Sequence, residues 1–212
     1  MYILGIESSC DESAASVLQA SGRKTVILSN IIASQIDIHA QYGGVIPEIA
    51  AREHVLNILP TIESALKQAK ITHRDLKAIA VTQGPGLITS LLAGVETAKA
   101  LSLVWNKPLI PVHHVIGHIY ANFINQSTSP RFPILALVVS GGHSNLVYMS
   151  EHYHFKIIGT TRDDAAGEAY DKAAKMLGLD YPGGPIIAQY AQEFRNNRMA
   201  SNILLPRPML NS

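Results

Sequence analysis

The stretch YILGIESSCDESAASVLQASGRKTVILSNIIAS, residues 2–34, decides the fold. Residues 2–7 are apolar and β-branched, which predicts a buried strand, and a polar turn over 8–13 follows it. Residues 14–20 and 25–34 predict two more strands around a short Ser-Gly-Arg-Lys turn. Because parallel strands need a long crossover, three strands joined by short turns predict an antiparallel meander.

Two long amphipathic segments follow the meander. Residues 47–69 predict a helix with proline at its first position, and residues 87–105 predict another after a buried strand over 78–82. A strand over 109–112 and a helix over 113–123 come next. The apolar stripes expected to face the core are Ile49, Leu56, Leu59, Ile62, Leu66 and Ala69 on the first helix, and Ile88, Leu91, Leu92, Val95 and Leu101 on the second.

The same order of elements starts again after the polar linker 125–130. The segments expected there are strands over 133–139, 144–149 and 154–160, a helix over 165–177 capped by Asp163 or Asp164, and a loop over 181–185. A repeated order predicts an α/β fold with two lobes facing a cleft, each sending one turn into it. We expect the first lobe over 1–126 and the start of a second, incomplete lobe over 131–212.

The composition excludes several classes of protein. Of the 212 residues, 47% are hydrophobic and 16% charged, which excludes a disordered chain. The formal net charge of +1 lacks the basic excess of a dedicated nucleic-acid binder. Cys10 is the only cysteine, so an internal disulfide is impossible. We expect no membrane span and no signal peptide, and a cytoplasmic location.

His114 and His118 form the strongest local signal. Four residues apart on a helix, they project from one face, as the two metal ligands of zinc proteases do. Such a protease needs glutamate directly after the first histidine, where this chain has Val115. The spacing therefore favours a metal site without protease chemistry, and two surface histidines remain an equal alternative.

Two glycine-rich turns invite a phosphate-binding interpretation. In the turn Ser140-Gly141-Gly142-His143, paired glycines let backbone N–H groups approach an anion, although an ordinary hairpin turn has the same composition. The segment 84–90, GPGLITS, lacks the lysine of a nucleotide-binding P-loop and is interpreted as a strand-to-helix turn.

Acidic residues gather in two places. Glu7, Asp11 and Glu12 follow the first strand, where a carboxylate can hold a metal-bound water or act as general base. Taken alone, this group is better explained as a solvated turn. Asp164, Glu168 and Asp171 are spaced to share a helix face, and Asp171 could reach a ribose hydroxyl. A solvated helix face explains the second group equally well.

Six motifs occur in the order found in one family. They are GIESSCDES, QYGGVIPEIAAREH, GPGLITSLLAG, HHVIGH, VSGGHSNL and DDAAGEAYDKAAKMLGLDYPGGP. In this set the chain resembles the bacterial tRNA adenosine threonylcarbamoyltransferases (TsaD), over nearly its whole length. The resemblance implies a two-lobed fold like those of actin and sugar kinases. It also implies transfer of a threonylcarbamoyl group from threonylcarbamoyl-adenylate to N6 of the adenosine 3′ to the anticodon, in tRNAs that read codons beginning with A.

The resemblance also implies roles for individual residues. His114 and His118 match the family's metal-binding histidines, which hold one divalent ion, iron in preference to zinc. Asp11 and Glu12 match acidic residues that face the reaction centre. The positions that match adenylate-binding residues are Val138, Val139, Ser140, Gly141, Gly142, Asp171 and Gly184.

The implied partners are tRNA, a paralogous scaffold protein that docks on the helix 47–69, and a small ATPase. Family members carry an aspartate metal ligand and a substrate-binding asparagine beyond the position of Ser212, so we expect the 212-residue chain alone to be inactive. Ile116 stands where many members have an acidic residue. The alternatives are a non-catalytic scaffold of the same complex and an actin-like kinase or ATPase.

Overall fold

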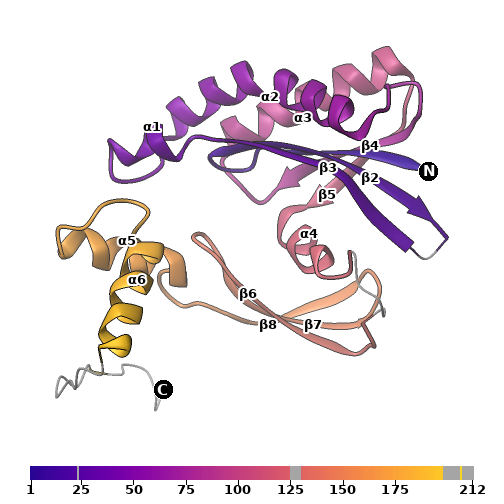
Figure 1. Ribbon diagram of the computed structural model, residues 1–212. Helices are drawn as coiled ribbons and strands as arrows, with labels where there is room; N and C mark the ends of the chain where they lie inside the picture. Colours follow the sequence, from indigo (N-terminus) through magenta and orange to yellow (C-terminus); the bar gives the residue numbers. More distant parts are fainter. Residues whose placement is uncertain (23, 125–129, 198–205, 207–212) are drawn as a thin grey trace.

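The structure is a computed structural model that describes residues 1–22, 24–124, 130–197 and 206 (Figure 1). Its strands are β1 (Tyr2–Glu7), β2 (Glu12–Ser21), β3 (Lys24–Ser34), β4 (Leu76–Gly84), β5 (Leu109–His113), β6 (Ile134–Val139), β7 (Ser144–Glu151) and β8 (His154–Thr160). Its helices are α1 (Ile36–Ala40), α2 (Pro47–Ala69), α3 (Ile88–Trp105), α4 (His114–Ala121), α5 (Ala166–Met176) and α6 (Gly183–Asn196). The predicted α/β class is confirmed.

The first sheet has the strand order β3-β2-β1-β4-β5. The strands β1, β2 and β3 pair antiparallel, as the short turns predicted, whereas β1, β4 and β5 run parallel. The carboxyl ends of β1, β4 and β5 therefore meet at one edge of the sheet, where open α/β folds bind ligands.

Helices α2 and α3 pack together and cover one face of this sheet (Figure 1). Helix α2 has the predicted bounds, but the predicted stripe is only partly right: Ile62 is buried, while Leu56 and Leu59 are 67% and 54% exposed. The buried face instead comprises Ala50, His54, Ile58, Thr61, Ile62 and Ala65. Apolar residues occur on both faces of α2, so the period alone did not select the inner one.

The predicted stripe of helix α3 is also only partly right, because Val95 and Leu101 do pack against the core. Its buried residues are Ser90, Gly94 and Ala98, and Ile88 and Leu92 are exposed, so small residues bring the helix close to the sheet. The Ser8 hydroxyl donates a hydrogen bond to the carbonyl oxygen of Ser90 at 2.8 Å. By length and composition, α3 is the one helix in the described ranges that could cross a membrane, with a mean hydropathy of 1.2. Only 17% of this segment is buried, and it packs on α2 and β4.

The second half forms a three-stranded antiparallel sheet, β6-β7-β8. Helix α4 lies between the two sheets (Figure 1), and Ile119, Val147 and Met149 form a small core beneath it. The predicted order of strand, turn, strand, strand and helix is thus present in both halves. The division into lobes at 126 and 131 stays a prediction, because residues 125–129 are outside the described residues.

Two predictions near the end of the chain are wrong. Ala165 is the N-cap of α5, and Asp164 forms an ion pair with Lys172 instead. The predicted loop over 181–185 turns into α6 at Gly183. A proline in the first helical turn needs no N–H partner, so Pro185 fits as the third residue of α6, where the sequence suggested a loop. Apart from Pro206, the expectation of no helix or strand over 199–212 falls outside the described residues.

Candidate functional site

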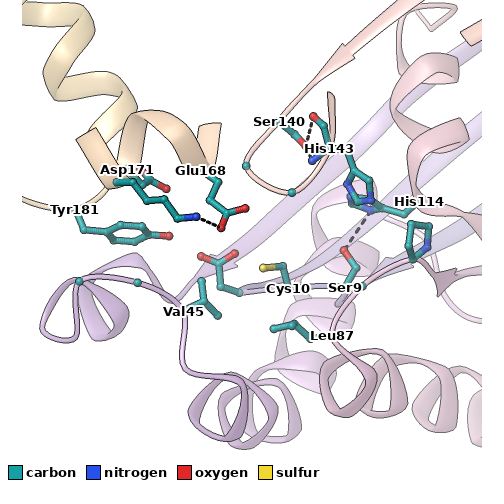
Figure 2. Close-up of a pocket in the computed structure, with 18 of the residues that line it drawn as sticks. Ser9, Cys10, Val45, Leu87, His114, Ser140, His143, Glu168, Asp171 and Tyr181 are labelled. Atoms are coloured by element: carbon teal, nitrogen blue, oxygen red, sulfur yellow. Dashed lines mark hydrogen bonds and ion pairs between the residues drawn. The ribbon is translucent and has the colours of Figure 1, made fainter. Parts of the chain in front are cut away.

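A cavity of about 760 Å³ lies between the turns of the two halves (Figure 2). Figure 2 shows Ser9 and His114 on one side, and Glu168, Asp171 and Tyr181 on the other. The turn after β1 and the turn before β7 both line it, as the repeated order predicted. This volume is within the range of about 300–1,000 Å³ that small-molecule sites occupy.

The wall formed by the first sheet comes from the carboxyl ends of its parallel strands. The turn after β1 and the turn after β4 are fastened together: the N–H of Leu87 donates to the carbonyl oxygen of Ser9 at 2.8 Å. A Cβ atom on Gly86 would stand 2.5 Å from that same oxygen. Only glycine allows these two backbones to approach so closely. The contact fixes the place of Cys10 and Asp11, which line the cavity.

His114 and His118 lie on one face of α4, as predicted. Their Nε2 atoms are 3.2 Å apart, and the rings are nearly perpendicular at 84°. Two nitrogen ligands of a tetrahedral metal, each about 2.0–2.1 Å from it, lie about 3.3 Å apart. Loss of hydration and then the neighbouring His114 lower the pKa of His118, so that ring keeps the neutral form that binds metals.

The pair stands at the boundary of two pockets. His114 lines the cavity, and His118 lines an apolar groove of about 490 Å³ beside β6. No group of three or more histidine, cysteine, aspartate or glutamate side chains that could hold a metal occurs within the described ranges. A catalytic metal usually has three protein ligands, so a metal held by this pair would need at least one more.

Glu7 lies behind His114. One carboxylate oxygen, Oε2, accepts a hydrogen bond from the Thr82 hydroxyl at 2.7 Å and stands 3.1 Å from Nδ1 of His114. The other, Oε1, accepts the N–H of Ser9. Burial alone would raise the pKa of Glu7, but the hydrogen bonds from His114, Thr82 and Ser9 outweigh it and hold the pKa at about 2. Glu7 is therefore a carboxylate at neutral pH.

The wall formed by the second half is the turn Ser140–His143. Its ends are tied, because the N–H of Ser140 donates to the carbonyl oxygen of His143 at 2.8 Å, and the N–H of His143 donates to Oγ of Ser140 at 3.0 Å. Helix α5 presses on it: a Cβ atom on Gly167 would stand 2.7 Å from Cα of Gly141. A Cβ on Gly142 would meet no described atom within 4 Å, so the turn is open toward the cavity.

The predicted adenylate-binding residues do not all line this cavity. Ser140, Gly141, Gly142 and Asp171 do. Val138 and Val139 lie at the end of β6 and line the apolar groove with His118 instead. Gly184 is in the first turn of α6, with its Cβ position 3.9 Å from Cβ of Tyr170.

The acidic residues also separate. Asp11 lines the cavity, whereas Glu12 is exposed at the first position of β2. Lys172 bridges Asp164 and Glu168, at 2.6 Å and 3.0 Å. Asp171 turns the other way, and its Oδ1 accepts the N–H of Gly183 at 2.8 Å. Of the three acids predicted to share one helix face, Asp164 and Glu168 therefore share Lys172 as their partner, and Asp171 has a different one.

Two residues at the site had no predicted role, and the partner of a third, Glu7, was not predicted. Glu7 is a charged residue at the end of a buried strand, which is itself a signal for a paired carboxylate. Lys172 and Tyr181 line the cavity without any distinctive spacing in the sequence. Loss of hydration, followed by the charges of Asp11 and Asp171, raises the pKa of Tyr181 to about 12, so its hydroxyl remains a donor.

Comparison with known proteins identifies the family. The model of the family described as tRNA N6-adenosine threonylcarbamoyltransferase (TsaD) matches residues 26–211. The relative of that name from Bacillus subtilis is 55% identical over 99% of this chain, and the one from Thermomicrobium roseum is 53% identical over 99%. The chain spans 58% and 57% of these relatives' lengths. It is also similar to the structure of YeaZ from Pseudomonas aeruginosa, with a TM-score of 0.47 at 15% identity, over 79% of this chain and 70% of that one. The chain belongs to the tRNA N6-adenosine threonylcarbamoyltransferase family, TsaD.

Proposed function

We propose that the protein transfers the threonylcarbamoyl group of threonylcarbamoyl-adenylate to N6 of the adenosine 3′ to the anticodon, in tRNAs that read codons beginning with A. Family membership over 26–211 supports this reaction. The observation that carries it is the pair His114 and His118, with Nε2 atoms 3.2 Å apart beside a cavity of small-molecule size. A non-catalytic scaffold would have no use for such a pair.

The adenylate would occupy the cavity. Its phosphate would lie against the open turn Ser140-Gly141-Gly142, where backbone N–H groups can approach an anion. Asp171 would accept a hydrogen bond from a ribose hydroxyl through the carboxylate oxygen that does not cap α6. Val138, Val139 and Gly184 lie further from the cavity, so we propose a supporting role for them.

His114 and His118 would hold one divalent metal ion, iron in preference to zinc. Their imidazole nitrogens, at a separation that suits one ion, fit this group. When bound, the metal supplies Lewis-acid polarisation of carbamoyl or phosphate oxygens.

The acceptor amine attacks the carbamoyl carbon, AMP leaves, and the amine gives up a proton. Asp11, which lines the cavity, would receive that proton. Glu12, exposed at the start of β2, is less well placed for this step.

The proposed partners are tRNA, the paralogous scaffold protein and the small ATPase of the modification complex, in the cytoplasm. The exposed residues Val55, Leu56 and Leu59 on the outer face of α2 support docking of the scaffold there. Single exposed apolar side chains are common, but three together on one helix mark a contact surface.

The function is tested in cells depleted of their own transferase. The reading frame that encodes this chain, with any codons that follow Ser212, is expressed, and the threonylcarbamoylated nucleoside is measured by mass spectrometry of tRNA. We expect His114→Ala to abolish the modification and His154→Ala, an exposed histidine on β8, to leave it intact. Equal rescue by His114→Ala would refute the proposal.

A further inference from the structure

We propose that Glu7 positions His114 by accepting its Nδ1–H, which leaves the lone pair of Nε2 directed at the metal. This inference rests on the proposed function, since it concerns the same site. Glu7 is a positioning residue here, because its carboxylate lies on the Nδ1 side of the ring, away from Nε2 of His118.

The fold fixes the carboxylate from neighbouring strand ends. The parallel register pairs Ile6 with Val81, so the next residues, Glu7 and Thr82, lie side by side. The Thr82 hydroxyl donates to Oε2 at 2.7 Å, and the N–H of Ser9 donates to Oε1. Each carboxylate oxygen of Glu7 therefore has a hydrogen-bond donor other than His114.

A carboxylate in this place selects one form of the histidine. A neutral imidazole carries one proton, on Nδ1 or on Nε2. With Oε2 of Glu7 only 3.1 Å from Nδ1, and Oγ of Ser9 at 3.2 Å, a proton on Nδ1 makes a hydrogen bond. A proton on Nε2 would set two lone pairs against each other across that distance. The geometry thus frees Nε2 as a ligand, the arrangement by which carboxylates orient metal-binding histidines.

Glu7→Gln removes this selection with little change of shape. Glu7 accepts donors on both oxygens, whereas glutamine has one oxygen and one amide NH₂ group. If the NH₂ group faces Thr82 and His114, the hydroxyl can rotate and the ring must accept at Nδ1, which places the proton on Nε2. If the NH₂ group faces Ser9 instead, it meets the Ser9 N–H, and two hydrogen-bond donors then point at each other. Glu7→Asp keeps the charge on a shorter side chain and should restore part of the effect.

The first experiment follows the ring directly, in metal-free protein at a pH where the imidazole is neutral. Nitrogen-15 NMR of the histidine rings should show the proton of His114 on Nδ1 in the wild type, and its move to Nε2 in Glu7→Gln. A wild-type ring protonated on Nε2 would overturn the inference, even if every variant failed to fold.

The second experiment measures Co²⁺ and Zn²⁺ affinity by titration calorimetry, on the protein encoded by the whole reading frame with any codons that follow Ser212. We expect a loss of about 10–100-fold in Glu7→Gln, a smaller loss in Glu7→Asp, and no change in Glu96→Gln, an exposed carboxylate paired with Lys99. Unchanged affinity and an unchanged ring proton in Glu7→Gln would overturn the inference. If no protein bound either metal while the ring proton still moved, the metal site of the proposed function would fail and the hold of Glu7 on His114 would stand.

Discussion

The Cβ position of Gly86 lies 2.5 Å from the carbonyl oxygen of Ser9, closer than any real side chain could stand. The same oxygen accepts the N–H of Leu87, so the turns after β1 and β4 touch through backbone alone. The position of the loop that carries Cys10 and Asp11 is therefore fixed by its contact with the turn after β4.

Gly86→Ala should force these turns apart. Overpacking of this kind costs about 1–3 kcal/mol, so we expect that loss in the free energy of unfolding, measured by urea denaturation. Gly117→Ala is the matched control, since its Cβ would sit at an ordinary 3.7 Å from Val112. Alanine also favours a helix by about 1 kcal/mol over glycine, so the control should be neutral or more stable. Equal effects of the two changes would contradict the close approach.

The structural contact of Asp171 with the start of α6 can be tested separately from its proposed contact with the ribose. Because its Oδ1 accepts the N–H of Gly183 at the start of α6, Asp171→Ala should lower stability by about 0.5–2 kcal/mol. Asp171→Asn keeps an oxygen for this cap but loses the charge available to a ribose hydroxyl. We expect thermal unfolding of Asp171→Asn close to wild type together with weaker AMP binding by calorimetry. If both variants lost stability equally, the cap would not be the structural duty of this residue.

The inner face of α2 can be tested against the face that its apolar period favoured. Leu56 is 67% exposed, so Leu56→Lys should change the free energy of unfolding by no more than about 0.5 kcal/mol. Ile62 is 3% exposed in the core, so Ile62→Ala should cost about 2–5 kcal/mol. The free energy of unfolding of both variants is measured by chemical denaturation. A large loss of stability in Leu56→Lys would mean that the face of α2 that carries Leu56 is the buried one.

Cys10 should react slowly although it is exposed. Loss of hydration, then the charges of Asp11, Glu12 and Glu7, raise the pKa of its thiol to about 12. The thiolate is the reactive form, and little of it is present below the pKa. The rate of Cys10 labelling should therefore rise steadily with pH through the alkaline range. At pH 8 we expect labelling by a disulfide reagent about 10–100-fold slower than in the unfolded chain, since a more basic thiolate is partly more reactive. A folded rate equal to the unfolded one would contradict the raised pKa.

Local sequence patterns were enough to predict the order of the helices and strands and the shared helix face of His114 and His118. The turn Ser21-Gly22 and the four-residue step from His114 to His118 act within a few residues, so their geometry follows from the chain itself. Glu7 and His114 are 107 residues apart and meet only when β1, β4 and α4 assemble. No local pattern contains that contact. Helix α6 was missed for a different reason, because its Gly-Gly-Pro start resembles a loop more than a helix.

The contact between Gly141 and Gly167 makes these two positions depend on one another. Gly167 donates its N–H to the carbonyl oxygen of Ser140 at 3.1 Å and leaves no room for a side chain, whereas Gly142 faces open space. In a library randomised at Gly142 and Gly167, a screen for folding alone would reject every change at the second and accept many at the first. A screen for adenylate binding would then reject those as well. Packing requires glycine at Gly167 in α5, and the proposed adenylate site requires it at Gly142 in the turn that α5 touches, so two neighbouring elements carry separate evolutionary constraints.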